Sequence, residues 1–156
     1  MIEYIKKIYE WLETSGASFG DVSKIQMVSG LVTEEYEEFI QAHKENNDDE
    51  IVDAFVDLVW VLANNTYFRG IHLERVERMF ELVMLSNFSK FAKTELEASE
   101  TVLDYQAGNH FDKPGVKINT YYKKVNDHHF VIKRTEDDKV LKSKNYNTVS
   151  YLDLIM

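Results

Sequence analysis

The sequence predicts a mainly α-helical protein that ends in a small β-hairpin or meander. Apolar residues recur at helical spacing through most of the first 93 residues. Beyond the only proline, Pro114, the pattern changes to short runs that are typical of strands. At 156 residues the chain fits one domain. We therefore expect a bundle of four to five helices in residues 1–110 and a small β-containing extension in residues 111–156.

Two helices are expected in the first part of the chain. The first covers residues 2–13, where isoleucine, tyrosine and leucine side chains share one face. Small residues between Thr14 and Gly20 interrupt it. Asp21 or Ser23 then caps a second helix that runs to about Lys44.

Two more helices follow short turns. The third begins after an Asn-Asn-Asp turn and spans about Asp48–Phe68; because it is apolar nearly all round, it is expected to be central and buried. Gly70 ends it as a C-cap. The fourth runs from His72 to about Lys93.

The later segments are shorter. Residues 95–108 fit either an extension of the fourth helix or a helix of their own. Strands are expected over residues 116–125, 130–134 and 139–142, with turn residues between them. These strands make up the predicted hairpin or meander.

Composition limits the function classes. Cysteine is absent, which excludes disulfides and thiol chemistry. The N-terminus does not resemble a signal peptide and no apolar run reaches roughly 20 residues, so we expect a cytoplasmic protein without membrane contact. The net charge of -9 argues against nucleic acid as a partner. Residues 113–144 nevertheless carry nine Lys and Arg against four acids, which suits either a polyanion or a solvated tail.

One acidic stretch concentrates the negative charge. Residues 34–57 hold ten Asp and Glu against one Lys, so their net charge of -9 equals that of the whole chain. Asp53 and Asp57 interrupt an apolar run from Ile51 to Trp60, where a carboxylate is costly unless it is paired or binds a metal. This stretch is therefore the first candidate for a functional site.

Helical geometry groups the carboxylates into two stripes, one on each of two neighbouring helices. At about 100° per residue, Glu35 and Glu38 lie one turn apart on the second helix and form the first stripe. On the third helix, Glu50, Asp53 and Asp57 lie within about 60° of one another and form the second stripe, which Asn64 continues. An antiparallel pair with a short turn can bring the stripes face to face, and oxygen ligands suit Mg²⁺ or Mn²⁺ rather than Zn²⁺. The expected metal ligands are Glu35, Glu38, Glu50, Asp53 and Asp57.

Two alternatives concern these acids. Glu34, Glu37 and Glu45 fit a solvated helix surface equally well. A di-iron helical bundle would also collect carboxylates, but it needs Glu-x-x-His pairs, and none of the five histidines has a Glu three residues before it. That alternative is therefore weak.

Four segments occur in a recognisable order. They are Thr-Glu-Glu-Tyr-Glu-Glu-Phe at 33–39, the acidic and apolar segment 50–62, Ser-Asn-Phe-Ser-Lys at 86–90 and Lys-Val-Leu-Lys-Ser-Lys-Asn-Tyr at 139–146. Together they resemble the all-α nucleoside triphosphate pyrophosphohydrolases, the MazG-like and dimeric dUTPase-like superfamily, and the last two are similar to its phage-type members. The similarity extends from about residue 19 to about residue 153, and it implies a helical bundle of the MazG-like type.

The resemblance implies a Mg²⁺-dependent hydrolase that cleaves an NTP or dNTP to the monophosphate and pyrophosphate. By position, Glu35 and Glu38 match the first pair of metal ligands, and Asp57 matches the terminal Asp of the second motif. A homodimer or a higher homo-oligomer is also implied, and the apolar third helix suggests the same.

One position departs from the family pattern. Ala54 stands where many members have a Glu, so either Asp53 or Glu50 must supply that ligand. The departure leaves a second hypothesis open, a catalytically silent helical module that binds a nucleotide or a protein.

Other side chains are expected to contact the substrate. Glu34 is the candidate that orients or deprotonates the attacking water. Asn87 and Lys90 are expected to contact a base, sugar or phosphate group, although Lys90 is equally well explained as a cation at a helix end. The remaining expected binding residues are Gln26, which would line a base pocket with Phe19 and Trp60, and Lys142, Lys144 and Tyr146, which would form a basic flap.

Overall fold

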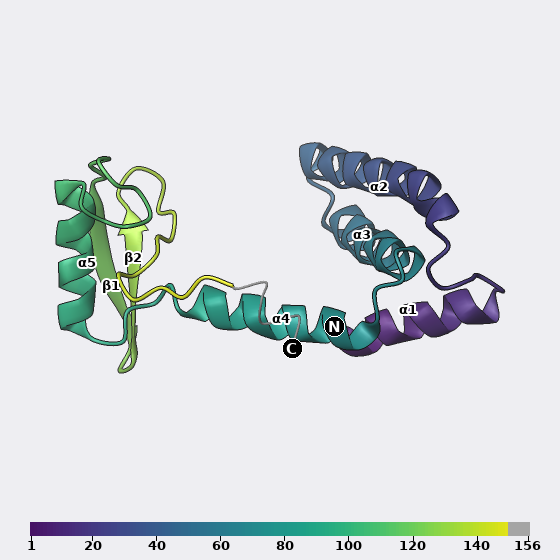
Figure 1. Ribbon diagram of the computed structural model, residues 1–156. Helices are drawn as coiled ribbons and strands as arrows, with labels where there is room; N and C mark the ends of the chain where they lie inside the picture. Colours follow the sequence, from purple (N-terminus) through teal and green to yellow (C-terminus); the bar gives the residue numbers. More distant parts are fainter. Residues whose placement is uncertain (150–156) are drawn as a thin grey trace. The chain divides into compact units, whose positions relative to one another are not determined.

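The computed structural model describes residues 1–149, so the part of the family resemblance beyond residue 149 lies outside them (Figure 1). The chain forms two compact units, Met1–Arg78 and Met79–Met156. The predicted class, a mainly α protein with a C-terminal hairpin, is confirmed. The predicted domain boundary near residue 110 stays a prediction. No helix within the described residues is long and apolar enough to span a bilayer.

The N-terminal unit is helical throughout. It contains α1 (Ile2–Thr14), the short 3₁₀ helix η1 (Val22–Lys24), α2 (Ile25–Glu45), α3 (Asp48–Phe68) and the first turns of α4 (Leu73–Phe88). Apolar side chains of α1 pack against α2 and α3, because the periodic residues of α1 all face one way. The buried core consists of Ile5, Ile8, Tyr9, Leu12, Val28, Ala63, Tyr67 and Phe68.

Helices α2 and α3 form a tight hairpin (Figure 1). Asn46 ends α2 in the left-handed conformation, with φ of 53°, which asparagine tolerates better than most residues. The side-chain Oδ1 of Asn47 then accepts a hydrogen bond from the backbone N–H of Glu50 at 3.4 Å and so caps α3. The predicted asparagine turn therefore sets two long helices side by side, with two residues between them.

A second turn holds α3 to the segment before α2. Gly70 follows α3 with φ of +67°, as expected for a C-capping glycine. A Cβ on Gly70 would lie 3.4 Å from the Cα of Gly20, and the N–H of Gly20 donates to the carbonyl of Tyr67 at 3.1 Å. Both residues have a positive φ, 78° for Gly20 and 67° for Gly70, so both positions favour glycine.

The prediction that α3 is buried is only partly correct. Within the N-terminal unit, α1 and α2 cover two sides of α3, and the third side is left open. Its exposed apolar residues are Val52 (62%), Phe55 (50%), Val56 (55%) and Leu62 (51%). An all-round apolar pattern shows that a helix needs covering, but it does not show what covers it.

The C-terminal unit packs one helix on a hairpin. Helix α5 (Glu95–Ala107) lies against β1 (Thr120–Asn126) and β2 (His129–Arg134), which pair antiparallel (Figure 1). Their buried core consists of Ala92, Ala98, Tyr105, Phe130 and Ile132. Residues 139–142 form no third strand; only Val140 makes an isolated bridge, with Lys133.

The fourth helix is shorter than predicted, and α5 is a separate helix. α4 ends at Phe88 rather than Lys93, and Ala92 forms a bridge with Phe130 of β2 instead of a further helical turn. Thr94 then caps α5 by accepting a hydrogen bond from the N–H of Glu97 at 3.1 Å. The carboxylate of Glu97 accepts from the N–H of Lys93 at 2.9 Å, an arrangement close to a capping box.

Candidate functional site

The carboxylates predicted from the sequence gather on α2 and α3 in the N-terminal unit. Glu35 on α2 and Asp57 on α3 are half-buried, while the acids beside them are exposed. We call this set the carboxylate face. It consists of Glu34, Glu35 and Glu38 from α2 and Asp53 and Asp57 from α3.

The electrostatics of Glu35 show that these acids share one environment. Partial desolvation raises the pKa of Glu35, and the negative charges of its four companions raise it further; in decreasing order these are Asp57, Glu38, Glu34 and Asp53. Acids from both helices therefore act on one carboxyl group. The hairpin brings the two stripes together, as the helical angles predicted.

The structure separates the two residues that were candidates for the missing ligand. Ala54 is 5% exposed and lies inside the fold, where a longer carboxylate side chain would have to be buried. Asp53 is among the four acids that raise the pKa of Glu35 most, and Glu50 is not. Glu50 lies at the first turn of α3, where its N–H is capped by Asn47. This placement favours Asp53.

The carboxylate oxygens of this face suit a hard divalent cation, but the side chains are spread apart in this conformation. All five groups offer carboxylate oxygens, the ligands that Mg²⁺ prefers, and their mutual repulsion would be relieved by a positive charge. Among the described residues, no three His, Asp or Glu side chains converge closely enough to hold a metal in this conformation. Glu34, Glu38 and Asp53 are exposed, so their side chains are free to rotate toward a cation.

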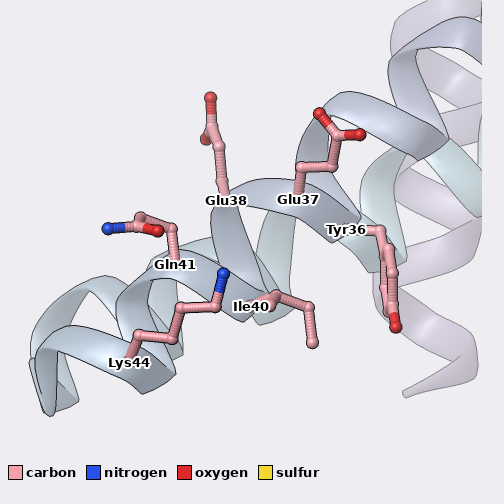
Figure 2. Close-up of a pocket in the computed structure, with 6 residues that line it drawn as sticks. All are labelled: Tyr36, Glu37, Glu38, Ile40, Gln41 and Lys44. Carbon is pink, nitrogen blue, oxygen red and sulfur yellow. The ribbon is translucent and has the colours of Figure 1, made fainter.

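Glu38 of the carboxylate face also lines a pocket on α2. The pocket measures about 630 Å³ and is formed by α2 alone. Figure 2 shows the side chains of Glu37 and Glu38 extending to the same side of the helix, away from that of Tyr36. Glu37 is not among the four acids that raise the pKa of Glu35 most. It therefore lies outside the carboxylate face.

Asn64 is a further polar residue on the stripe of α3. It lies two turns beyond Asp57 and is 8% exposed, and its Oδ1 has no hydrogen-bond partner among residues 1–149. A buried acceptor without a partner costs free energy. In the sequence its signal is an amide within the apolar run of α3.

The two later segments of the family resemblance meet in the C-terminal unit. The hydroxyl of Ser86 lies 2.8 Å from the hydroxyl of Tyr146 and donates to the carbonyl of Asn147 at 2.9 Å. The N–H of Ser143 donates to the carbonyl of Lys90 at 3.1 Å. The end of α4 and the C-terminal segment therefore form one hydrogen-bonded cluster.

Each predicted binding residue of this cluster already has a partner within the chain. Lys90 Nζ donates to Asn87 Oδ1 at 2.7 Å. Lys142 Nζ lies 2.6 Å from Asp112 Oδ1 and 4.6 Å from the centroid of the Tyr146 ring. Lys144 Nζ lies 2.7 Å from Glu100 Oε2. A phosphate group would have to compete with these contacts, and the basic flap stays a prediction.

The three residues expected to form a base pocket have different surroundings. The Phe19 ring packs edge-on against Tyr67, with centroids 5.2 Å apart, and the Trp60 ring packs against Trp11 at the same distance. Gln26 is exposed on α2. A shared base pocket is therefore not visible here, and it stays a prediction.

The N-terminal unit is helical throughout, and its paired helices α2 and α3 both contribute acids to the carboxylate face. Residues 14–82 match the family described as PRA-PH, phosphoribosyl-ATP pyrophosphohydrolase. This family lies within the MazG-like all-α NTP pyrophosphohydrolase superfamily. The matched segment is less than half of the chain; it contains the whole carboxylate face and stops before Ser86. No curated protein and no solved structure gives a significant match.

The match supports the coarse class that the sequence predicted. It suggests a pyrophosphohydrolase, a hydrolase of phosphoric anhydrides, that acts on a nucleotide-type substrate.

Proposed function

We propose that this protein is a Mg²⁺-dependent pyrophosphohydrolase that cleaves a nucleoside triphosphate to the monophosphate and pyrophosphate. The observation that carries the proposal is the field of four acids, from two helices, at the half-buried Glu35. A fold gains nothing from such repulsion, so the arrangement is best explained by a ligand that needs it. The family match over residues 14–82 supports the same reaction class.

Each acid has a role in this proposal. Glu35, Glu38, Asp53 and Asp57 would hold Mg²⁺, which, when bound, neutralises phosphate charge and polarises water. Glu34 lies beside them, is exposed and contributes to the same field. It would accept the proton of the attacking water.

The test is pyrophosphate release in the presence of Mg²⁺ over a panel of NTPs and dNTPs. Phosphoribosyl-ATP belongs in the panel, because the description of the matching family names it. We expect Glu38→Ala and Asp57→Ala to abolish release. Glu37→Ala is the matched control, since it removes the same charge from the neighbouring position outside the carboxylate face.

Two results would contradict the proposal. The first is retained turnover in Glu38→Ala or Asp57→Ala with circular dichroism unchanged. The second is a wild-type protein that releases no pyrophosphate from any member of the panel. If that wild type still bound Mg²⁺ and a nucleotide, the silent binding module would be the better description.

We also propose that the open side of α3 is covered by a second copy of the chain. Phe55, Val56 and Trp60 line a largely apolar groove of about 660 Å³ between α3 and α1. A homodimer would bury this groove. Light scattering on the wild type and on Phe55→Lys tests this; a monomeric wild type at tens of micromolar would contradict it.

A further inference from the structure

The C-terminal unit contains a second polar pocket, far from the carboxylate face in sequence. It measures about 620 Å³ and lies between the segment before β1 and the end of β2. Its lining includes three cations, one acid and two apolar side chains. They are Lys113, Lys117, Arg134, Glu136, Val116 and Ile118. We call it the anion pocket.

The two lysines that line the pocket, unlike four other lysines of the C-terminal unit, have no carboxylate partner in the described part of the chain. Within the C-terminal unit, Lys124, Lys133, Lys142 and Lys144 each lie within 4.0 Å of a carboxylate. Lys113 and Lys117 have no such partner among residues 1–149. Two adjacent positive charges without a counter-ion in the fold are suited to bind one from solution.

Arg134 adds a fixed donor to these charges. Its Nε–H donates to Asp137 Oδ1 at 2.7 Å, and its Nη2 donates to Asp137 Oδ2 at 2.5 Å. This two-point contact fixes the plane of the guanidinium and leaves Nη1 without a partner in the described chain. A guanidinium held in this way is preorganised to bind a second anion, because little rotamer entropy remains to be lost.

Backbone hydrogen bonds hold the walls of the pocket in place. The N–H of Thr135 donates to the carbonyl of Asn119 at 2.9 Å, and the N–H of Ile118 donates to the carbonyl of Tyr105 at 3.0 Å. The N–H of Gly115 donates to the carbonyl of Gly108 at 2.8 Å. The pocket is thus built on ordered backbone, and its volume lies within the usual range for small-ligand sites.

We propose that the anion pocket binds a small organic phosphate. Lys113 and Lys117 supply two positive charges without a carboxylate partner, and Arg134 adds a guanidinium that it shares with Asp137, a set that favours an anionic ligand over a neutral one. Lysine ammonium and arginine guanidinium groups are the usual phosphate partners. Val116 and the half-buried Ile118 offer an apolar surface for the organic part of the ligand.

The test is isothermal titration of the full chain with inorganic pyrophosphate and with AMP, in EDTA. Without a divalent cation the carboxylate face repels phosphates, so binding there does not contribute. Failure of the proposed hydrolase activity would leave this measurement unaffected. We expect saturable binding, weakened about tenfold or more in Lys113→Gln/Lys117→Gln and changed less than about twofold in the matched control Lys123→Gln.

The outcomes are distinct. Equal affinity for both probes supports a pocket that recognises phosphate charge alone, and tighter binding of AMP supports contact with the apolar wall. The proposal is overturned if neither probe binds at millimolar concentration. It is also overturned if the double variant, with circular dichroism unchanged, binds as well as the wild type.

Discussion

The two units have equal length but differ in net charge and in how their charged side chains are paired. Residues 1–78 hold seven Lys and Arg against sixteen acids and so carry the full net charge of -9, whereas residues 79–156 hold eleven of each. In the C-terminal unit, ion pairs such as Lys142–Asp112 and Lys144–Glu100 join distant segments. On the carboxylate face, acids surround another acid.

This difference shows where charge serves the fold and where it serves a ligand. A charge paired within the chain orders two segments, and a ligand has to compete with that partner for it. A group of like charges weakens the fold, and it is retained when binding compensates for the loss. The N-terminal unit therefore holds the better candidate for catalysis, although the C-terminal unit holds more of the expected phosphate-binding lysines.

The largest predicted effects test whether the units are separate. Ile8 is 4% exposed in the first core, and Ile132 is fully buried in the second. Truncation of either residue to alanine should lower the free energy of unfolding by about 2–5 kcal/mol. Both tryptophans, Trp11 and Trp60, lie in the N-terminal unit, so their fluorescence reports its unfolding.

We therefore expect Ile8→Ala to move the fluorescence midpoint in urea and Ile132→Ala to leave it in place. The unfolding curve followed by far-ultraviolet circular dichroism, which reports both units, should shift to lower urea concentration in each variant. Equal shifts of the fluorescence midpoint would show that the units unfold as one, and the comparison would then be wrong.

Periodicity predicted α1, α2 and α4 because each has an apolar stripe, whereas α3 is apolar nearly all round. The predicted bounds of α3 agree with the structure. The end of α4 was missed because apolar residues continue at helical spacing to Phe91, while a tertiary bridge from Ala92 to Phe130 ends the helix. The start of α5 had a local signal, Thr94-x-x-Glu97, which resolves the ambiguity of residues 95–108.

The grouping of the acids was predictable, since helical angles depend on sequence spacing alone. The choice between Glu50 and Asp53 was not, because the two lie within 60° of each other and differ mainly in their distance along α3. The partners of Lys142 and Lys144 come from Asp112 and Glu100, 30 and 44 residues away, and no local pattern reveals such contacts.

A smaller effect is expected from the Lys142–Asp112 pair. Both side chains are about one-third exposed or less, and Lys142 also lies over the Tyr146 ring. Asp112→Asn should lower the free energy of unfolding by about 1–2 kcal/mol, as for a charge-assisted hydrogen bond. The carboxylate of Asp112 raises the pKa of Lys142.

The pH dependence of that loss follows from its sign. The stabilisation is fully present below the pKa of an unfolded lysine, about 10.4, and disappears as pH rises through the higher pKa of the folded state. Urea unfolding at pH 7 and above pH 11 should therefore give a gap between wild type and variant that narrows with pH. A gap independent of pH would indicate that Asp112 acts through packing.

The smallest effect has the opposite sign and concerns Glu35. Desolvation and the surrounding acids raise its pKa in the folded state, so its contribution to stability is present below the unfolded value of about 4.3 and is lost as pH rises through the folded value. Glu35→Gln should thus be more stable than the wild type at pH 7 by about 0.5 kcal/mol, as for other like-charge contacts on helices. The difference should vanish below about pH 4.

Glu37→Gln, outside the carboxylate face, should show no such gain. Thermal unfolding of the three proteins at both pH values measures this. A Glu35→Gln variant less stable than the wild type at pH 7 would mean that Glu35 makes a favourable contact in the fold, and the reason for regarding this face as a binding site would be lost.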